Sequence, residues 1–463
     1  MIADLRPYAE YKDSGVPWVG NVPAHWEIRP NRGLFAEVVD RGHGKEQLLS
    51  VTISRGIIKQ QTLLQGSSKR DSSRADRSGY KLVHPGDLAY NKMRAWQGAI
   101  GVSSLRGIVS PAYVVFRPRP NTIKPDFCHF LYRTLMFAGE AQSRSYGIAS
   151  DMWSFRPEDF RAVNSPFPPP DEQAAIVRFL DWATRRVDRA IRAKRRLVAL
   201  LTEQKQAIIH RAVTQGLDPS VPMKESGIPW LGEIPAHWEV RRLSAVARFR
   251  NGKAHEQFID PAGAYVCVNA RFVSTDGHKR KLCTRNLTPA HIGDVLMVMS
   301  DLPNGRALAR AFLVRDDGHY AVNQRVCALT PHKIDPRLLA YSSNRNWHLL
   351  RQNDGFNQTH LSNYDFKTMP ILLPPPDEQI QIAEWIDHRV RAMDAQLGGL
   401  ASQIELLREY RARLVADVVT GKLDVRAFAE TLPDEAPDDI EATEADVDED
   451  ADDDETGDGA DEG

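Results

Sequence analysis

Long apolar runs are missing from this sequence of 463 residues. No stretch approaches the roughly 18 apolar residues that cross a bilayer, and the first fifteen residues lack the basic and then apolar order of a secretion signal. Cysteine is scarce, and the four cysteines form no C-x-x-C pair and no spacing typical of a zinc site: Cys128, Cys267, Cys283 and Cys327. These absences predict a cytoplasmic protein with no membrane partner, no bound metal and no disulfide framework.

Motifs for catalysis are also missing. The sequence has no G-x-x-x-x-G-K-[ST], no H-E-x-x-H and no glycine fingerprint for a nucleotide cofactor. Pro170-Asp171 with Glu203-Gln204-Lys205 resembles a PD…ExK nuclease, but both parts lie on one predicted helix, about 48 Å apart at 1.5 Å per residue, and cannot share one Mg²⁺. "NSPF" at 164–167 resembles the tetrapeptide of amino-methyltransferases, yet the second copy has "TMPI" at that place. We expect no catalytic residue and no cofactor in this chain.

Charge is unevenly distributed along the chain. The net charge of −1 includes an acidic tail, in which 17 acidic residues and no basic residue lie between Asp434 and Glu462. Outside the tail, 60 Lys and Arg residues face 44 Asp and Glu residues, an excess that suits a polyanionic partner such as DNA. The tail itself is predicted to be disordered. Two roles are open for it: competition with phosphate for the basic domains, which would temper non-specific binding, or solubility.

Two motifs occur twice. "SGVPWVGNVPAHWE" (14–27) returns as "SGIPWLGEIPAHWE" (226–239), and "PPPDEQ" occupies both 168–173 and 374–379. Self-similarity over this distance indicates a duplicated structural unit. The chain is therefore predicted to contain two similar halves.

A long helix is predicted after each "PPPDEQ". Steps of three or four residues pass from Ile176 to Ala212 through eleven positions, nine of them apolar, and the same register holds from Ile382 to Val418. Gly216 and Gly421 suit the left-handed conformation that closes a helix. Each helix would be about 44 residues, or roughly 65 Å, so each needs an equally long partner, and the other helix is the obvious one. Antiparallel pairing fits the connectivity and predicts that Val418 to Asp424 lies beside Tyr11 to Trp18.

The predicted fold class is α+β: two similar mixed α/β domains separated by two long helices that form an antiparallel coiled coil with pseudo-twofold symmetry. Strands are expected at Asp87–Met93, Ala112–Pro118, Ala264–Ala270 and Asp294–Ser300, and one helix over Phe127–Gln142. The expected segments are a first domain at 1–167, a central helix at 168–216, a second domain at 217–373, a C-terminal helix at 374–424 and the acidic tail at 425–463.

Polar and aromatic side chains gather at the ends of predicted strands. "NKMRAWQG" (91–98) combines phosphate-binding cations with Arg and Gln, which can read guanine and adenine edges. The second copy has "NARFVSTDGHKRK" (269–281) and "VNQRV" (322–326) instead. The candidate DNA-binding residues are Arg55, Lys92, Arg94, Trp96, Gln97, Arg271, Lys279, Arg280, Asn323, Gln324 and Arg325.

These motifs resemble the specificity subunits of type I restriction-modification enzymes. The residues that carry the resemblance are the repeated 14–27 and 226–239 segments, Gly86 to Pro118, Val268 to Gly277, "NQRV" and both "PPPDEQ" helices, over about Tyr11 to Asp424. The resemblance implies a non-catalytic subunit with two target-recognition domains, each of which reads one half of a split double-stranded DNA site. It also implies two modification (methyltransferase) subunits docked on the helices, and restriction (translocase/nuclease) subunits. S-adenosylmethionine, ATP and Mg would belong to those partners.

Two other functions stay open at this point. One is a DNA-modifying enzyme that acts alone, for which the sequence offers no site. The other is a coiled-coil scaffold or DNA-binding regulator without methyltransferase partners. The bases read by each half, the spacer length and the presence of a restriction subunit do not follow from the sequence.

Overall fold

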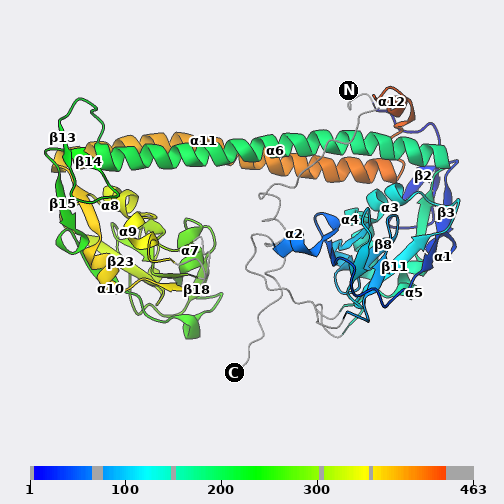
Figure 1. Cartoon of the computed structure of the whole chain (residues 1–463), viewed down its shortest axis with the longest axis horizontal. Coiled ribbons are helices and arrows are strands. Elements are labelled where there is room, and N and C mark those ends of the chain that lie inside the picture. The colour runs from blue at the N-terminus through cyan, green and yellow to red at the C-terminus, as the bar shows by residue number, and fades with distance from the viewer. Residues whose placement is uncertain (1–4, 65–76, 148–152, 302–306, 354–357, 434–463) are drawn as a thin grey trace. The chain divides into compact units, whose positions relative to one another are not determined.

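The computed structural model describes residues 5–64, 77–147, 153–301, 307–353 and 358–433. The chain divides into two compact units: unit 1 combines Met1–Arg196 with Ala401–Gly463, and unit 2 is Leu197–Leu400. Two long helices, α6 (Pro170–Gln215) and α11 (Pro376–Val419), contribute one half to each unit (Figure 1). Their bounds confirm the two predicted helices to within a few residues.

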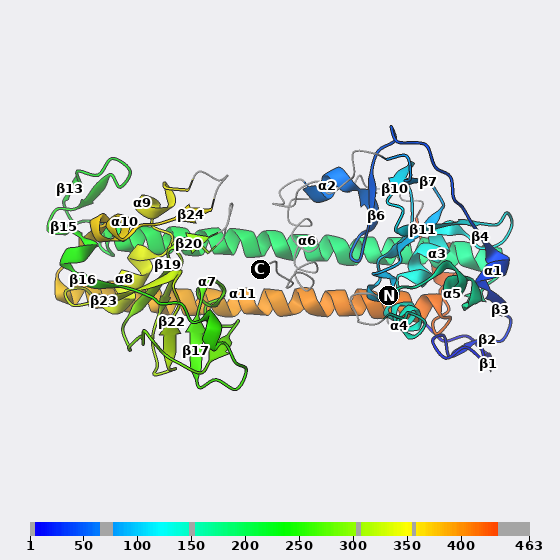
Figure 2. The same ribbon diagram turned by 90° about the horizontal axis from the view of Figure 1, so that it is seen from below.

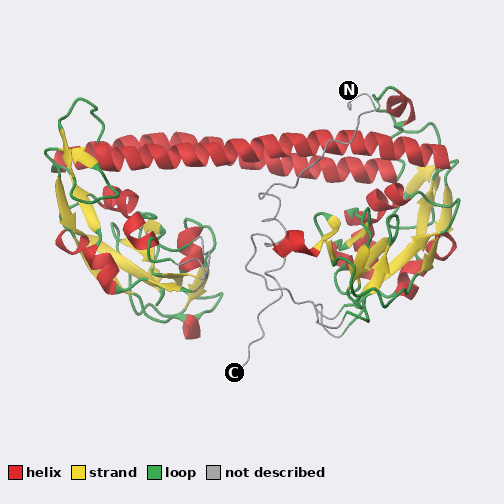
Figure 3. Cartoon of the chain, viewed as in Figure 1, coloured by secondary structure: helices red, strands yellow, loops and turns green. Residues whose placement is uncertain are grey.

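Each unit contains a four-stranded antiparallel sheet, and the strand order is the same in both. Ala89 pairs with Val115 at the centre of the first sheet, and Val295 pairs with Leu329 at the centre of the second. Figure 3 shows these strands in yellow with short helices beside them. The first sheet runs β4 (Phe35–Glu37), β11 (Tyr113–Pro118), β8 (Leu88–Asn91), β9 (Ile100–Val102), and the second runs β16 (Ala247–Asn251), β23 (Val326–Pro331), β19 (Val295–Val298), β21 (Ala311–Leu313).

Two small strand pairs also repeat. The pair β1 (Tyr11–Asp13) with β2 (Asn21–Pro23) corresponds to β13 (Met223–Glu225) with β14 (Glu233–Pro235). The second repeated pair joins the strand after "AHW" to the strand before "PPPDEQ", as β3 (Glu27–Pro30) with β12 (Asn164–Phe167) and β15 (Glu239–Arg242) with β25 (Pro370–Leu373). The "NSPF" segment is therefore a paired strand, in which Ser165 is buried against Tyr132 and Asn31.

The remaining strands differ between the units. Unit 1 has two separate pairs and unit 2 has a three-stranded sheet and one short pair. The strands are β5 (Leu49–Thr52) with β6 (Gly56–Lys59), β7 (Lys81–Val83) with β10 (Gly107–Val109), then β18 (Lys281–Cys283), β17 (Tyr265–Val268), β22 (Tyr320–Val322), and finally β20 (Ser300–Asp301) with β24 (Thr359–His360).

The predicted helix at 127–142 is two helices, so that prediction was wrong in its continuity. Helix α3 (Pro125–Tyr132) ends before Thr134, whose hydroxyl accepts a hydrogen bond from the backbone N–H of Phe137 and caps α4 (Leu135–Ser143). The other short helices are α1 (Asn31–Leu34), α2 (Gln60–Leu64), α5 (Pro157–Ala162), α7 (Ala270–Ser274), α8 (Pro336–Ser343), α9 (Trp347–Leu350), α10 (Asn363–Thr368) and α12 (Arg426–Glu430).

Both units bury the apolar face of a long helix in a core of their own. Ile176 and Leu180 of α6 join the core of unit 1, which also holds fully buried Trp26. Ile382 and Ile386 of α11 join the core of unit 2 around Trp238. The apolar residues near the start of each long helix therefore pack in the core of one unit, and residues further along pack on the other long helix.

Within each unit, half of α6 lies alongside half of α11, and the two run in opposite directions (Figures 1 and 2). In unit 1, Asp188 lies 3.0 Å from Arg411, and Lys194 donates to Gln403 at 2.6 Å. Val187 and Ile191 pack there against Ile404 and Leu407. In unit 2, Lys205 donates to Asp394. Through these contacts the residue numbers rise along α6 while they fall along α11, so the two helices are antiparallel.

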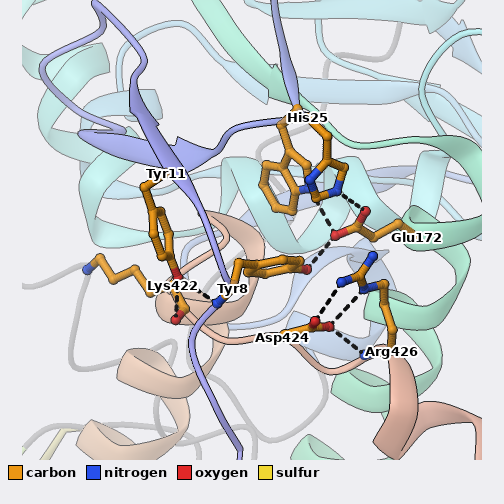
Figure 4. Close-up of polar contacts among 8 residues, drawn as sticks. Tyr8, Tyr11, His25, Glu172, Lys422, Asp424 and Arg426 are labelled. Atoms are coloured by element: carbon orange, nitrogen blue, oxygen red, sulfur yellow. Dashed lines mark hydrogen bonds and ion pairs between the residues drawn. The ribbon is translucent and has the colours of Figure 1, made fainter.

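The two repeated motifs meet at the start of each long helix. In unit 1, Glu172 of "PPPDEQ" accepts hydrogen bonds from the indole N–H of Trp26 at 2.9 Å and the hydroxyl of Tyr8, and lies 2.8 Å from His25 (Figure 4). In unit 2, Glu378 lies 2.7 Å from His237. Among the described residues, the buried indole nitrogen of Trp238 has no hydrogen-bond partner. The contact is therefore repeated, but it is more complete in unit 1.

The glutamine that ends "PPPDEQ" fixes the domain to the helix. Gln173 donates to the carbonyl of Pro168 at 2.8 Å and accepts from the N–H of Lys124 at 2.7 Å, just before α3. Gln379 repeats both contacts with Pro374 and Asp335, each at 2.8 Å. The motif is thus a structural joint between a domain and its long helix.

The predicted contact between the end of the second helix and the N-terminal segment is confirmed. The backbone N–H of Asp424 donates to the carbonyl of Arg6 at 2.9 Å. The Tyr11 hydroxyl donates to the carbonyl of Lys422 at 3.1 Å (Figure 4). Gly421, at a φ of 78°, lies so close to Pro23 that a Cβ would approach its ring to 2.3 Å. Glycine is therefore required at this helix end.

Candidate nucleic-acid interface

In unit 1 the predicted cluster lies on the turn between β8 and β9. The side chain of Asn91 accepts a hydrogen bond from the N–H of Met93 at 3.0 Å, and Gly98 closes the turn with a φ of 97°. The indole of Trp96 donates to the carbonyl of Met93 at 2.8 Å and its ring lies 5.6 Å from that of Trp153. Four half-buried side chains are presented here, namely Lys92, Arg94, Trp96 and Gln97.

Arg55 lies on the turn between β5 and β6, which the structure brings beside the first cluster. A Cβ on Gly98 would lie 3.8 Å from Ile53 of that turn. Arg133 joins the two segments, because its guanidinium donates to the carbonyls of Ile53 at 3.0 Å and of Ile100 at 2.9 Å. Sequence reasoning missed Arg133. Its only signal was a cation inside the helix predicted at 127–142.

Burial lowers the pKa of two groups in unit 1. Burial, and then the nearby Arg133, lower the pKa of His129 to about 4, and its Nδ1 accepts from the N–H of Val102 at 3.3 Å. His129 is therefore neutral at pH 7. Burial, and then the charge of Lys92, lower the pKa of the Lys81 ammonium, which donates to the carbonyl of Tyr113.

In unit 2, two strand ends come together. Strands β17 and β22 are parallel neighbours, with Val268 opposite Val322, so the residues that follow both strands leave at the same edge. The N–H of Asn323 donates to the carbonyl of Val268 at 3.1 Å. Exposed Arg271 of α7 and exposed Gln324 and Arg325 of the next turn therefore lie at one edge of this sheet.

Asn323 itself is used inside the protein. It is 6% exposed, its amide nitrogen donates to Glu256 at 2.8 Å, and its amide oxygen accepts from the N–H groups of His255 at 3.1 Å and Gln324 at 2.9 Å. Its backbone carbonyl also accepts from Val326 at 2.9 Å and closes the turn. The side chain shapes the loop that presents Gln324 and Arg325.

Lys279 and Arg280 are exposed on the loop after α7. Gly277 takes a φ of 80° at its start, and the guanidinium Nε of Arg280 donates to the carbonyl of Gly277 at 2.9 Å. This contact holds the Arg280 side chain against the loop and fixes its position relative to α7.

The two clusters correspond only in part. Arg55 and Arg271 each stand three residues after the corresponding strands β5 and β17. The turn after β10, "SPA" (110–112), corresponds to "NQR" (323–325) after β22. The counterpart of 91–98 follows β19 and lies partly outside the described residues, at 302–306. The same scaffold thus carries an arginine at one matching loop and different side chains at the other.

Over the described part of the chain, no helix is long and apolar enough to cross a membrane, and no cluster of three potential metal ligands occurs. All four cysteines are buried free thiols. Burial raises the pKa of the Cys267 thiol to about 11, which leaves it protonated and unreactive at pH 7.

Comparisons with known proteins show what this chain is similar to. A family model described as the type I restriction modification DNA specificity domain matches residues 235–405. A Methanocaldococcus jannaschii protein named as a type I restriction enzyme MjaX specificity subunit is 25% identical over 232 residues, 46% of this chain and 53% of that protein. The match therefore spans only about half the length of that relative.

Of two solved structures similar to this chain, the first shares its fold. One, described as the structural basis of complex assembly and conformational transition of a type I R-M system, has a TM-score of 0.62 and 16% identity, covering 87% of this chain and 99% of that chain. The HsdS subunit from Thermoanaerobacter tengcongensis has a TM-score of 0.39 at 18% identity, covering 88% and 98%. The matched specificity domain and this relative confirm the resemblance to specificity subunits of type I restriction-modification enzymes that the repeated motifs indicated.

Proposed function

We propose that the chain is the DNA sequence-recognition subunit of a type I restriction-modification complex and binds an asymmetric bipartite DNA site. One observation carries this proposal: two units repeat the same sheet order but present different side chains at matching loops. A duplicated scaffold with unlike loops suits two unlike half-sites. A palindromic reader would need like loops.

The proposed contacts are divided between the units. In unit 1, Arg55, Lys92, Arg94 and Gln97 would face DNA, with Trp96 packed on Trp153 to hold the turn. Arg forks suit guanine and Gln suits adenine, whereas the lysines would contact phosphate. In unit 2 the contacting residues would be Arg271, Lys279, Arg280, Gln324 and Arg325, and Asn323 would position the last two.

We assign the two target-recognition domains to 1–167 and 217–373, and the spacers to 168–216 and 374–424. The antiparallel pairing in each unit supports one continuous coiled coil with pseudo-twofold symmetry, which would fix the unread gap between half-sites. The segment 425–463 begins with α12 (Arg426–Glu430) and continues into the acidic tail.

The chemistry would be supplied by partners. Two modification subunits would bring S-adenosylmethionine and methylate adenine, and restriction subunits would use ATP and Mg. This chain would be a non-catalytic cytoplasmic subunit that directs them to the site. Partnerless DNA-binding regulation is the alternative to be separated by experiment.

The test is to co-express the chain with a modification subunit encoded beside it and to map methylated adenines across the host genome. We expect one asymmetric motif of two short specified parts separated by unspecified bases. A continuous or palindromic motif would contradict the proposal. Sequence-specific DNA binding without any methylation would favour the regulator alternative.

A further inference from the structure

Five arginines form a stripe on the first half of α6. Arg178, Arg185, Arg189, Arg192 and Arg196 are spaced by seven, four, three and four residues, which places them on one face of a helix. This arginine face lies opposite the buried positions of the same helix, among them Ile176, Leu180 and Val187. It extends about 27 Å at 1.5 Å per residue, and each arginine is exposed or half-buried.

The arginine face is absent from the other copy of the helix. The positions that correspond to it on α11 are Glu384, Arg391, Ala395, Gly398 and Ser402. The buried positions do repeat, because Ile176 and Leu180 correspond to Ile382 and Ile386, all 0% exposed. The fold therefore does not require these arginines. Among the described residues, no carboxylate lies within ion-pair distance of Arg192 or Arg196.

The acidic tail is the other feature without a counterpart in the repeat, and it starts beside this face. Helix α12 packs on α6, with the ring of Phe428 5.5 Å from Phe179 and 5.3 Å from Trp182. Leu432 is buried, and its carbonyl accepts a hydrogen bond from the guanidinium of Arg178, the first arginine of the stripe. The chain thus reaches residue 433 at one end of the arginine face.

We propose that residues 434–463 dock on the arginine face of α6 and cover it against other polyanions. The 17 acidic residues and the absence of basic ones give the tail the complementary charge. Thirty residues can extend to about 100 Å, far more than the roughly 27 Å of the stripe. Each exposed arginine–carboxylate pair is weak by itself, but a tethered segment with many carboxylates is held at high effective concentration.

The test measures binding of a fluorescein-labelled peptide of residues 434–463 to full-length chains at low salt, by anisotropy. The receptor is a neutral-tail chain in which the 17 acidic residues are replaced by Asn or Gln. The stripe variant adds Arg189→Gln, Arg192→Gln and Arg196→Gln. The matched control adds Arg32→Gln, Arg119→Gln and Arg413→Gln, three exposed arginines of the same unit that lie outside the stripe.

We expect the neutral-tail chain to bind the peptide about tenfold or more tightly than the unaltered chain, whose own tail competes for the face. The stripe variant should lose about tenfold or more, and the control should change by about twofold or less. Equal binding to unaltered and neutral-tail chains, or equal losses in stripe and control variants, would overturn the proposal. Since no DNA is used, the result is independent of the recognition function proposed above.

Discussion

At the scale of single residues, Glu172 and Glu378 occupy the same place in the repeat but differ in burial and in the contacts they make. The Glu172 side chain is 4% exposed and contacts Tyr8, His25 and Trp26, whereas that of Glu378 is 27% exposed and contacts His237. Burial, and then the hydrogen bond to Glu172, raise the pKa of the Tyr8 phenol, which therefore remains a donor.

Glu172→Gln should destabilise the protein more than Glu378→Gln. The amide offers one acceptor oxygen where the carboxylate satisfies several buried donors, so we expect a loss of about 1–3 kcal/mol in unfolding free energy. Glu378→Gln, at the more exposed counterpart, should lose less than about 1 kcal/mol. Urea unfolding followed by tryptophan fluorescence measures both variants. Equal losses would show that the extra contacts of Glu172 contribute nothing.

Arg94 tests the proposed base contacts. If its guanidinium reads a base, Arg94→Ala should cost about 1–3 kcal/mol in DNA binding and relax specificity at one position. Arg94→Lys should fail to restore that specificity, because an ammonium lacks the planar fork. Competition binding against single-base variants of the site measures both effects, with Arg32→Ala as the control. A uniform loss over all sequences would instead assign Arg94 to phosphate.

His129 makes a prediction about pH. Its folded pKa of about 4 lies below the ordinary value of 6.5, so the unfolded chain binds more protons between these values and stability falls as pH drops from 6.5 to 4. His129→Asn retains an acceptor for the N–H of Val102 and removes the titration. Between pH 6.5 and 4 the unfolding free energy of this variant should change less than that of the unaltered protein, and the difference between the two changes should be up to about 3 kcal/mol. An unchanged pH profile, matching that of the exposed control His332→Asn, would contradict the assignment.

At the scale of elements, periodic and local signals were sufficient for much of the fold. The two long helices follow from apolar positions repeated at helical spacing. Gly86 and Gly293 precede the predicted strands that begin at Asp87 and Asp294, and their φ values of 90° and 89° suit turns there. The break between α3 and α4 was missed because Thr134 caps a new helix within one apolar pattern.

The candidate site was less predictable, because long-range contacts assemble it. Sequence named Arg55 and Arg94 separately, and only the fold shows that Arg133 ties their turns together. The parallel pairing of β17 with β22 likewise brings Arg271 and Arg325, which are more than fifty residues apart in the sequence, to the same edge of the sheet. Asn323 has a polar side chain typical of base contacts, yet Glu256 and His255 occupy it. No local pattern reveals such internal partners.

The helix pairing gives an element-scale prediction. Ile404 is 8% exposed and packs on Val187 and Ile191, while Leu406, two residues away on α11, is 63% exposed. Ile404→Ala should lower the unfolding free energy by about 2–4 kcal/mol. Leu406→Ala should change it by less than about 0.5 kcal/mol. Chemical denaturation measures the pair, and equal effects would show that the helices do not share this seam.

At the scale of the whole molecule, the account is a duplication with divergent loops. The joints repeat. Gln173 and Gln379 make equivalent pairs of contacts. His25 contacts Glu172, and His237 contacts the corresponding Glu378. The loops that we propose to read DNA do not repeat as a whole. The same frame should therefore accept a new loop set in one unit without disturbing the other.

The most direct measurement is a genome-wide adenine methylation map of a hybrid chain in which Trp18 to Phe167 come from a related specificity subunit. The exchanged segment contains the β3–β12 pair whole, and the donor must keep the His25–Trp26 pair that contacts Glu172. We expect one half of the split motif to change to that of the donor, while the other half and the gap stay the same. A hybrid that methylates the original motif unchanged, or whose two half-sites both change, would contradict the central claim that each unit reads its own half-site.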